Sequence, residues 1–120
     1  MPPRKQGHWL EVETVGDVVV GRFVRCRILN EDAVQQAGEQ LLGLVEGGGQ
    51  PKVILDLRGV EGMSTSFLGK LTAFRTKVVD AGGQLALCRV SPLVQEILTI
   101  CRFDRLAPVY ASEQEALGSF

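Results

Sequence analysis

Three adjacent hydroxyl side chains form the cluster best suited to chemistry in this chain. Ser64, Thr65 and Ser66 follow a strongly apolar run, KVILDL at residues 52–57, and precede a segment with helical periodicity. Hydroxyls at such a junction can cap a helix, act as a nucleophile or accept a phosphate. The residues around them discriminate among these roles.

The motifs that would make this cluster catalytic are missing. Residues 62–66 read GMSTS, which is not the G-x-S-x-G of a nucleophile elbow, and the single histidine, His8, lies far away in the sequence. Neither GxxxxGK[ST] nor GxGxxG occurs, so the sequence lacks a phosphate-cradling loop for a nucleotide. We therefore expect no enzyme activity, no catalytic residue and no cofactor.

Capping and phosphorylation both remain open on these grounds. A helix needs acceptors for its first N–H groups, but one hydroxyl suffices for a cap. A phosphate in a first turn would meet unpaired N–H groups and the positive end of the helix dipole. At about 100° per residue, Ser66, Lys70, Ala73 and Lys77 share one stripe. We expect this stripe to be exposed, since the apolar residues lie opposite.

Composition predicts a single globular domain. The chain has 120 residues, of which 45% are hydrophobic and 22% charged, with a net charge of −1. Without a basic surplus we expect no nucleic-acid partner, and without a run of about 18 apolar residues no membrane span. Residues 1–8 are polar and are predicted to form a flexible N-terminal arm, with the domain at residues 9–120.

The cysteines do not suggest a disulfide framework or a metal site. Cys26, Cys88 and Cys101 are widely spaced, form no CxxC pair and lack histidine partners. Such thiols are typical of a reducing compartment, so we expect a cytoplasmic protein.

Periodicity predicts the element order β-β-α-β-α-β-α-β-α. Two alternating runs joined by Gly16-Asp17 indicate a hairpin, and residues 25–29 are interpreted as an extension of its second strand. The predicted strands are residues 10–15, 18–24, 52–57, 84–88 and 108–110, and the predicted helices begin at Asn30, near Ser66, at Ser91 and at Ser112. This alternation implies an α/β fold whose sheet is largely parallel, with functional loops at the strand carboxyl ends. The longest such loop is residues 58–66.

Residues 53–71, VILDLRGVEGMSTSFLGKL, resemble the central motif of STAS domains, the anti-sigma factor antagonist family. In that motif an apolar strand ends in Asp-Leu, a loop carries a small residue and Val, and Asp-Ser-Ser-Gly-Leu-Gly begins a helix. Asp56-Leu57, Gly59-Val60 and Leu68-Gly69 match it, and residues 82–106 resemble the family's later strand and helix. The resemblance implies a small mixed sheet flanked by helices.

The resemblance also implies roles for individual residues. The family's phosphorylated residue is the second hydroxyl of the motif, which corresponds to Ser66, and we expect Thr65 before it to be the cap. Ser64 stands where the family has Asp, and Phe67 where it has Gly, so Phe67 would add an apolar group to the partner contact. The partner-binding residues implied in this way are Ser64, Thr65, Phe67, Leu68, Lys70, Asp56 and Arg58.

The function implied by the resemblance is partner switching. The unphosphorylated antagonist binds an anti-sigma factor, often itself a serine kinase, and frees a sigma factor, whereas phosphorylation breaks the complex. Serine followed by Phe, an aliphatic residue, Gly and a basic residue is also similar to the scaffold subunits of stressosome-type assemblies. An alternative is therefore a scaffold or adaptor subunit that assembles with other STAS domains.

Overall fold

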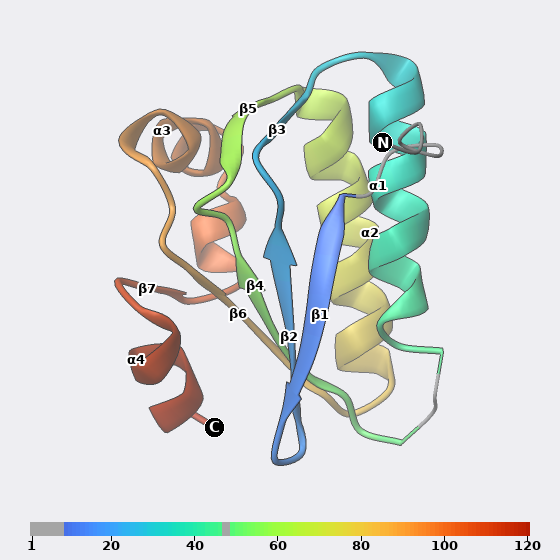
Figure 1. Cartoon of the computed structure of the whole chain (residues 1–120), viewed down its shortest axis with the longest axis vertical. Coiled ribbons are helices and arrows are strands. Elements are labelled where there is room, and N and C mark those ends of the chain that lie inside the picture. The colour runs from blue at the N-terminus through green and yellow to red at the C-terminus, as the bar shows by residue number, and fades with distance from the viewer. Residues whose placement is uncertain (1–8, 47–48) are drawn as a thin grey trace, which may run out of the picture.

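The computed structural model describes residues 9–46 and 49–120, so the arm predicted for residues 1–8 lies outside the described residues. Within these residues the strands are β1 Leu10–Val15, β2 Val18–Phe23, β3 Cys26–Ile28, β4 Lys52–Asp56, β5 Val60–Met63, β6 Gln84–Cys88 and β7 Val109–Tyr110. The helices are α1 Glu31–Gly43, α2 Thr65–Asp80, α3 Pro92–Ile100 and α4 Glu113–Gly118, with a short 3-10 helix, η1, at Phe103–Arg105. Figure 1 shows how they are arranged.

The main sheet is mixed, as predicted. Its strand order is β1-β2-β4-β6-β7, with β1 antiparallel to β2 and the other neighbours parallel. The predicted hairpin is confirmed: Val15 pairs with Val18, and Gly16 takes a positive φ of 63° at the turn. Glycine adopts that conformation without steric cost.

Residues 25–29 do not extend β2, and the segment predicted as one long loop contains a strand. Cys26–Ile28 forms the separate strand β3, which pairs in parallel with β5. Gly59 makes this pairing possible, because a Cβ there would lie 2.3 Å from the carbonyl oxygen of Phe23. The loop at Gly59 therefore lies close to the end of β2. The Cys26 N–H, just beyond that end, donates to the Gly59 carbonyl at 2.9 Å.

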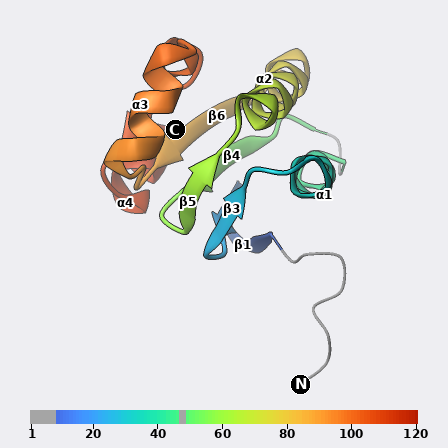
Figure 2. The ribbon, with the colours of Figure 1, turned by 90° about the horizontal axis from the view of Figure 1, so that it is seen from above.

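Helices cover both faces of the main sheet (Figures 1 and 2). Along β4, Val53 and Leu55 pack in the larger core with residues of α1, α2 and α3, whereas Ile54 packs in a smaller core with Ala116 of α4. All of these β4 side chains are fully buried. This explains why the predicted buried strand reads as a continuous apolar run rather than an alternating one.

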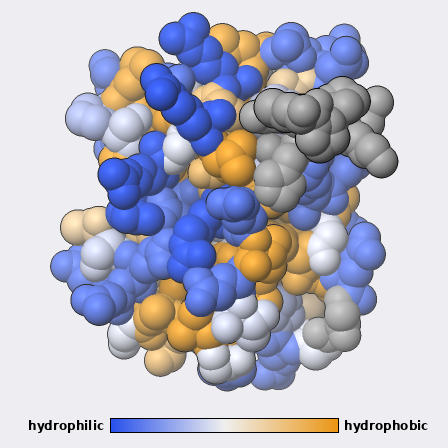
Figure 3. All heavy atoms as spheres, viewed as in Figure 1, coloured by the Kyte–Doolittle hydropathy of each residue, from blue (hydrophilic) through white to orange (hydrophobic). Residues whose placement is uncertain are grey.

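The face of the molecule in Figure 3 mixes hydrophilic side chains with several small hydrophobic groups. On β1, Val12 and Val15 are exposed. Isolated exposed apolar side chains are normal for globular proteins, so they do not by themselves indicate an interface. Among the described residues, no helix is both long enough and apolar enough to cross a bilayer.

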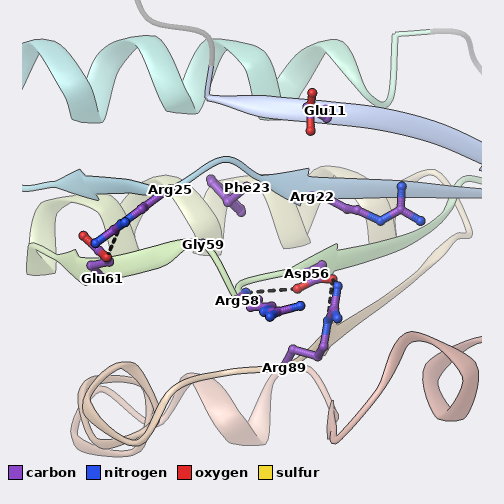
Figure 4. A pocket seen from close by; sticks show the side chains of 9 residues that line it. All are labelled: Glu11, Arg22, Phe23, Arg25, Asp56, Arg58, Gly59, Glu61 and Arg89. Atoms are coloured by element: carbon purple, nitrogen blue, oxygen red, sulfur yellow. Dashed lines mark hydrogen bonds and ion pairs between the residues drawn. The ribbon is translucent and has the colours of Figure 1, made fainter.

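A network of charged side chains joins the carboxyl ends of three strands to α4. The carboxylate of Asp56, at the end of β4, accepts hydrogen bonds from Arg89 Nε at 2.8 Å and from the Arg58 backbone N–H at 3.0 Å. Arg89 also lies 3.4 Å from the Glu113 carboxylate, to which Arg22 of β2 donates at 2.7 and 2.9 Å. We call Asp56, Arg89, Glu113 and Arg22 the charge network; Figure 4 shows the bond between Asp56 and Arg89.

The two carboxyl groups of the charge network respond to it in opposite directions. Burial raises the pKa of Asp56, helped by a hydrogen bond with Glu113, while Arg89 and the Arg58 N–H act against the shift. The hydrogen bonds that Arg22 donates are the main reason why the pKa of Glu113 is lowered to about 2. The network therefore holds a buried carboxylate that depends on Arg89 for its counter-charge.

We predict that Arg89→Met destabilises the fold by about 1.5–3 kcal/mol, because the buried Asp56 carboxylate would lose its charged hydrogen-bond donor. The matched control is Arg25→Met, which breaks a pair with Glu61 whose side chains are 85% and 40% exposed. That loss should be below about 1 kcal/mol. Urea unfolding measures the free energy of unfolding of both variants. An equal loss of that free energy in the two would show that the charge network stabilises the fold no more than an exposed ion pair does.

We also predict a pH dependence that originates in Glu113. Because its pKa is about 2 in the folded chain and about 4.5 unfolded, ionised Glu113 stabilises the fold fully above pH 4.5. This contribution is lost as the pH falls from 4.5 towards 2. Urea unfolding across that range should show a steeper loss of stability for the wild type than for Glu113→Gln, and parallel pH profiles would refute the assignment.

Candidate partner-binding site

The hydroxyl cluster lies where β5 ends and α2 begins. The Ser64 N–H donates to the Ile28 carbonyl at 2.9 Å, which ties this junction to the end of β3. Thr65 and Ser66 are exposed, while Ser64 is half-buried. The cap of α2 and the exposure of each side chain decide which of these hydroxyls is accessible.

The cap of α2 is Ser64, so the prediction that Thr65 is the cap is wrong. Ser64 has extended backbone angles, and its Oγ accepts a hydrogen bond from the Phe67 N–H at 3.3 Å. Thr65 is the first helical residue. Serine and aspartate are both good N-caps, so serine at this position keeps the capping chemistry but not the charge.

The expectation that Phe67 contacts a partner is also wrong, because Phe67 is fully buried. Its ring packs edge-on against Phe23 with the centroids 6.0 Å apart. Phe67 stands in one apolar stripe with Leu71, Phe74 and Val78, which are buried as well. That helical spacing was a signal in the sequence that would have placed Phe67 in the core.

Two further residues predicted to contact a partner are buried. Leu68 is 4% exposed and belongs to the core, and Asp56 is 2% exposed and bound in the charge network. Neither can present its side chain to a partner on this surface. Arg58 is exposed, but it lines a different cavity from Ser66.

The cavity that Arg58 lines lies beside the charge network and has a volume of about 340 Å³. Figure 4 shows its lining, which is Glu11, Arg22, Phe23, Arg25, Asp56, Arg58, Gly59, Glu61 and Arg89. Most of its charged groups already pair with each other, as Arg25 does with Glu61 at 2.6 Å. We therefore interpret this cavity mainly as the outer side of a structural network.

A groove of about 380 Å³ separates the first turn of α2 from the first turn of α1. It is lined by Leu29, Glu31, Val34, Gln35, Ser64, Ser66 and Lys70. Lys70 Nζ donates to Gln35 Oε1 at 3.2 Å and so bridges the two helices. We call this the hydroxyl groove.

Leu29 gives the hydroxyl groove an exposed apolar wall. Its side chain is 55% exposed, and it follows β3 directly, just before the cap of α1 at Asn30. Sequence reasoning missed Leu29, because a single apolar residue after a strand carries no periodic signal. The groove thus combines a hydroxyl, a cation and an apolar side chain on one surface.

Comparison with known proteins gives consistent results. Residues 11–116 match the STAS domain profile. BtrV of Bordetella bronchiseptica, named as a candidate anti-sigma factor antagonist, is 26% identical over 106 residues, which cover 87% of this chain and 90% of BtrV. An anti-sigma F factor antagonist of Paenibacillus polymyxa is 29% identical over 65 residues, which cover 54% of this chain and 56% of that protein.

A solved structure agrees in sequence as well as in shape. The anti-sigma-factor antagonist (STAS) domain protein from Planctomyces limnophilus is 32% identical, with a TM-score of 0.81 over 92% of this chain and 96% of that one. The α/β fold with a mixed sheet is therefore shared with that protein. The chain belongs to the STAS domain family, and its named relatives are anti-sigma factor antagonists.

Proposed function

We propose that this protein is a phosphorylation-switched anti-sigma factor antagonist. In its unphosphorylated form it binds an anti-sigma factor that is also a serine kinase, and so releases a sigma factor. The protein is a ligand and a substrate in this cycle rather than an enzyme, and the role places it in the cytoplasm. The names of its relatives support the antagonist role.

One observation carries the choice of Ser66 as the switch. Of the three hydroxyl residues, Ser64 is engaged as the cap, and Thr65 is exposed but does not line the hydroxyl groove. Ser66 is exposed and does line it. Within the described residues, no hydrogen bond or ion pair engages the Ser66 side chain. Its Oγ is therefore available to a kinase.

The chemistry of the switch requires no change of fold. The terminal phosphoryl group of ATP is transferred to Ser66 Oγ, which loses its proton as ADP leaves, and a phosphatase later uses water to release inorganic phosphate. The first turn of α2 contains no acidic residue. A phosphate there interacts favourably with the helix dipole instead of disrupting the helix.

The same phosphate opposes partner binding at the hydroxyl groove. A partner that packs an apolar group against Leu29 must remove water from the neighbouring position 66. Removing water from a hydroxyl costs little, whereas removing it from a phosphate with nearly two negative charges is costly, because a single cation in the groove does not balance that charge. Phosphorylation thereby changes affinity through local desolvation and repulsion.

We predict that Ser66→Asp weakens binding to the anti-sigma factor at least tenfold, about 1.4 kcal/mol, while Ser66→Ala binds like the wild type. Thr76→Asp is the control, because Thr76 is exposed further along α2 and does not line the hydroxyl groove. Calorimetric titration measures the three affinities. If Ser66→Asp binds like the wild type and sedimentation shows a large defined oligomer, the scaffold function replaces this proposal.

A second prediction tests the apolar wall. Leu29→Ala should lower partner affinity roughly tenfold with little loss of stability, because the side chain is exposed in the unbound protein. Leu93→Ala on α3 is a matched control, since Leu93 is also 55% exposed but does not line the groove. Surface plasmon resonance compares them, and a loss confined to Leu93→Ala would move the contact away from the groove.

A further inference from the structure

Lys70 is the charged residue one helical turn after Ser66. Both side chains line the hydroxyl groove, and the spacing of four residues places them on the same face of α2. An acidic group four residues before a lysine is the favourable orientation for an ion pair on a helix. Ser66 has no charge, so Lys70 has no such pair on α2 until a phosphate is added.

The half-buried side chain of Lys70 reaches across to α1. Its Nζ donates to the neutral amide of Gln35 at 3.2 Å. Its aliphatic stem lies against Gly38, where a Cβ would be only 3.0 Å from Lys70 Cδ and 3.2 Å from Cγ. Because Gly38 has no Cβ, the lysine stem packs closely against the backbone of α1.

The neutral partner makes this arrangement easy to change. A hydrogen bond between an ammonium group and a phosphate is stronger than one between an ammonium group and an amide. The other charged residue that lines the groove is Glu31 in the first turn of α1, which would repel a phosphate and leave Lys70 as its counter-charge. Exchanging the neutral amide of Gln35 for a phosphate at position 66 is therefore favourable for the Lys70 ammonium group.

We infer that Lys70 is the counter-ion for phosphorylated Ser66 and holds the phosphate inside the hydroxyl groove. This inference rests on the proposed function, and it adds a mechanism for how the modified state is fixed. In the unmodified protein Lys70 bridges α2 to Gln35, and in the modified protein it binds the phosphate. The phosphate then occupies the space beside Leu29 that the partner would use.

The test introduces phosphoserine at position 66 during translation, so that it does not depend on a kinase. Phosphorus NMR then gives the second pKa of the phosphate, which is about 6 for an unperturbed phosphoserine. A nearby cation favours the dianion, so this pKa should be about 0.5 lower in the wild type than in Lys70→Gln. Lys70→Arg should restore the lower pKa, because it keeps the charge.

Lys77→Gln is the matched control, since Lys77 is an exposed lysine of α2 that lies outside the groove. It should leave the phosphate pKa unchanged. Equal pKa values in the wild type and Lys70→Gln, or an equal rise in Lys77→Gln, would overturn the inference even if Ser66 phosphorylation controls partner binding. A low phosphate pKa that depends on Lys70 would uphold it even if no kinase modifies Ser66.

Discussion

The burial of Phe67 is the constraint on which the rest of the site depends. Its ring packs against Phe23 in the core, and its N–H is held by the Ser64 cap, so the first turn of α2 is fixed at two points. A helix fixed in this way has one rotational setting. Ser66 is then turned outward to the hydroxyl groove, and Lys70, one turn later, lies over α1. The large side chain at position 67 therefore orients Ser66, the switch residue that we propose, and is not itself exposed to a partner.

The charge network and the proposed partner surface lie in separate parts of this domain. The charge network holds the ends of β2, β4 and β6 and attaches α4 through Glu113, while the hydroxyl groove lies between the first turns of α1 and α2. Asp56 belongs to the first group although it stands in the motif that marks the family. The phosphate that we propose for Ser66 would thus add charge at a surface that lies apart from the charge network of the sheet. This separation allows the surface to change charge while the fold stays the same.

Much of the fold could be predicted because its signals are local. The alternating hairpin, the buried run of β4 and the helix starts at Ser91 and Ser112 each follow from a few consecutive residues. The pairing of β3 with β5 could not be predicted, since it depends on the close approach of Gly59 to a distant strand. For the site, the family motif predicted Ser66, Lys70 and Phe67 as surface residues. The helical spacing of Phe67 with the other apolar residues of α2 instead indicated that Phe67 is buried. The position of Leu29 in the groove wall and the pairing of Arg89 with Glu113 both depend on contacts between segments far apart in the sequence. No spacing of residues in the sequence reveals such contacts.

We propose that one phosphate on Ser66 controls partner affinity through the hydroxyl groove. The most direct measurement is a calorimetric titration of the cognate anti-sigma factor with the unmodified protein and with protein fully phosphorylated on Ser66, as verified by mass spectrometry. We expect tight binding of the unmodified form and a loss of affinity of at least a hundredfold, about 2.7 kcal/mol, on phosphorylation. Equal affinity of the two forms for the partner would contradict it.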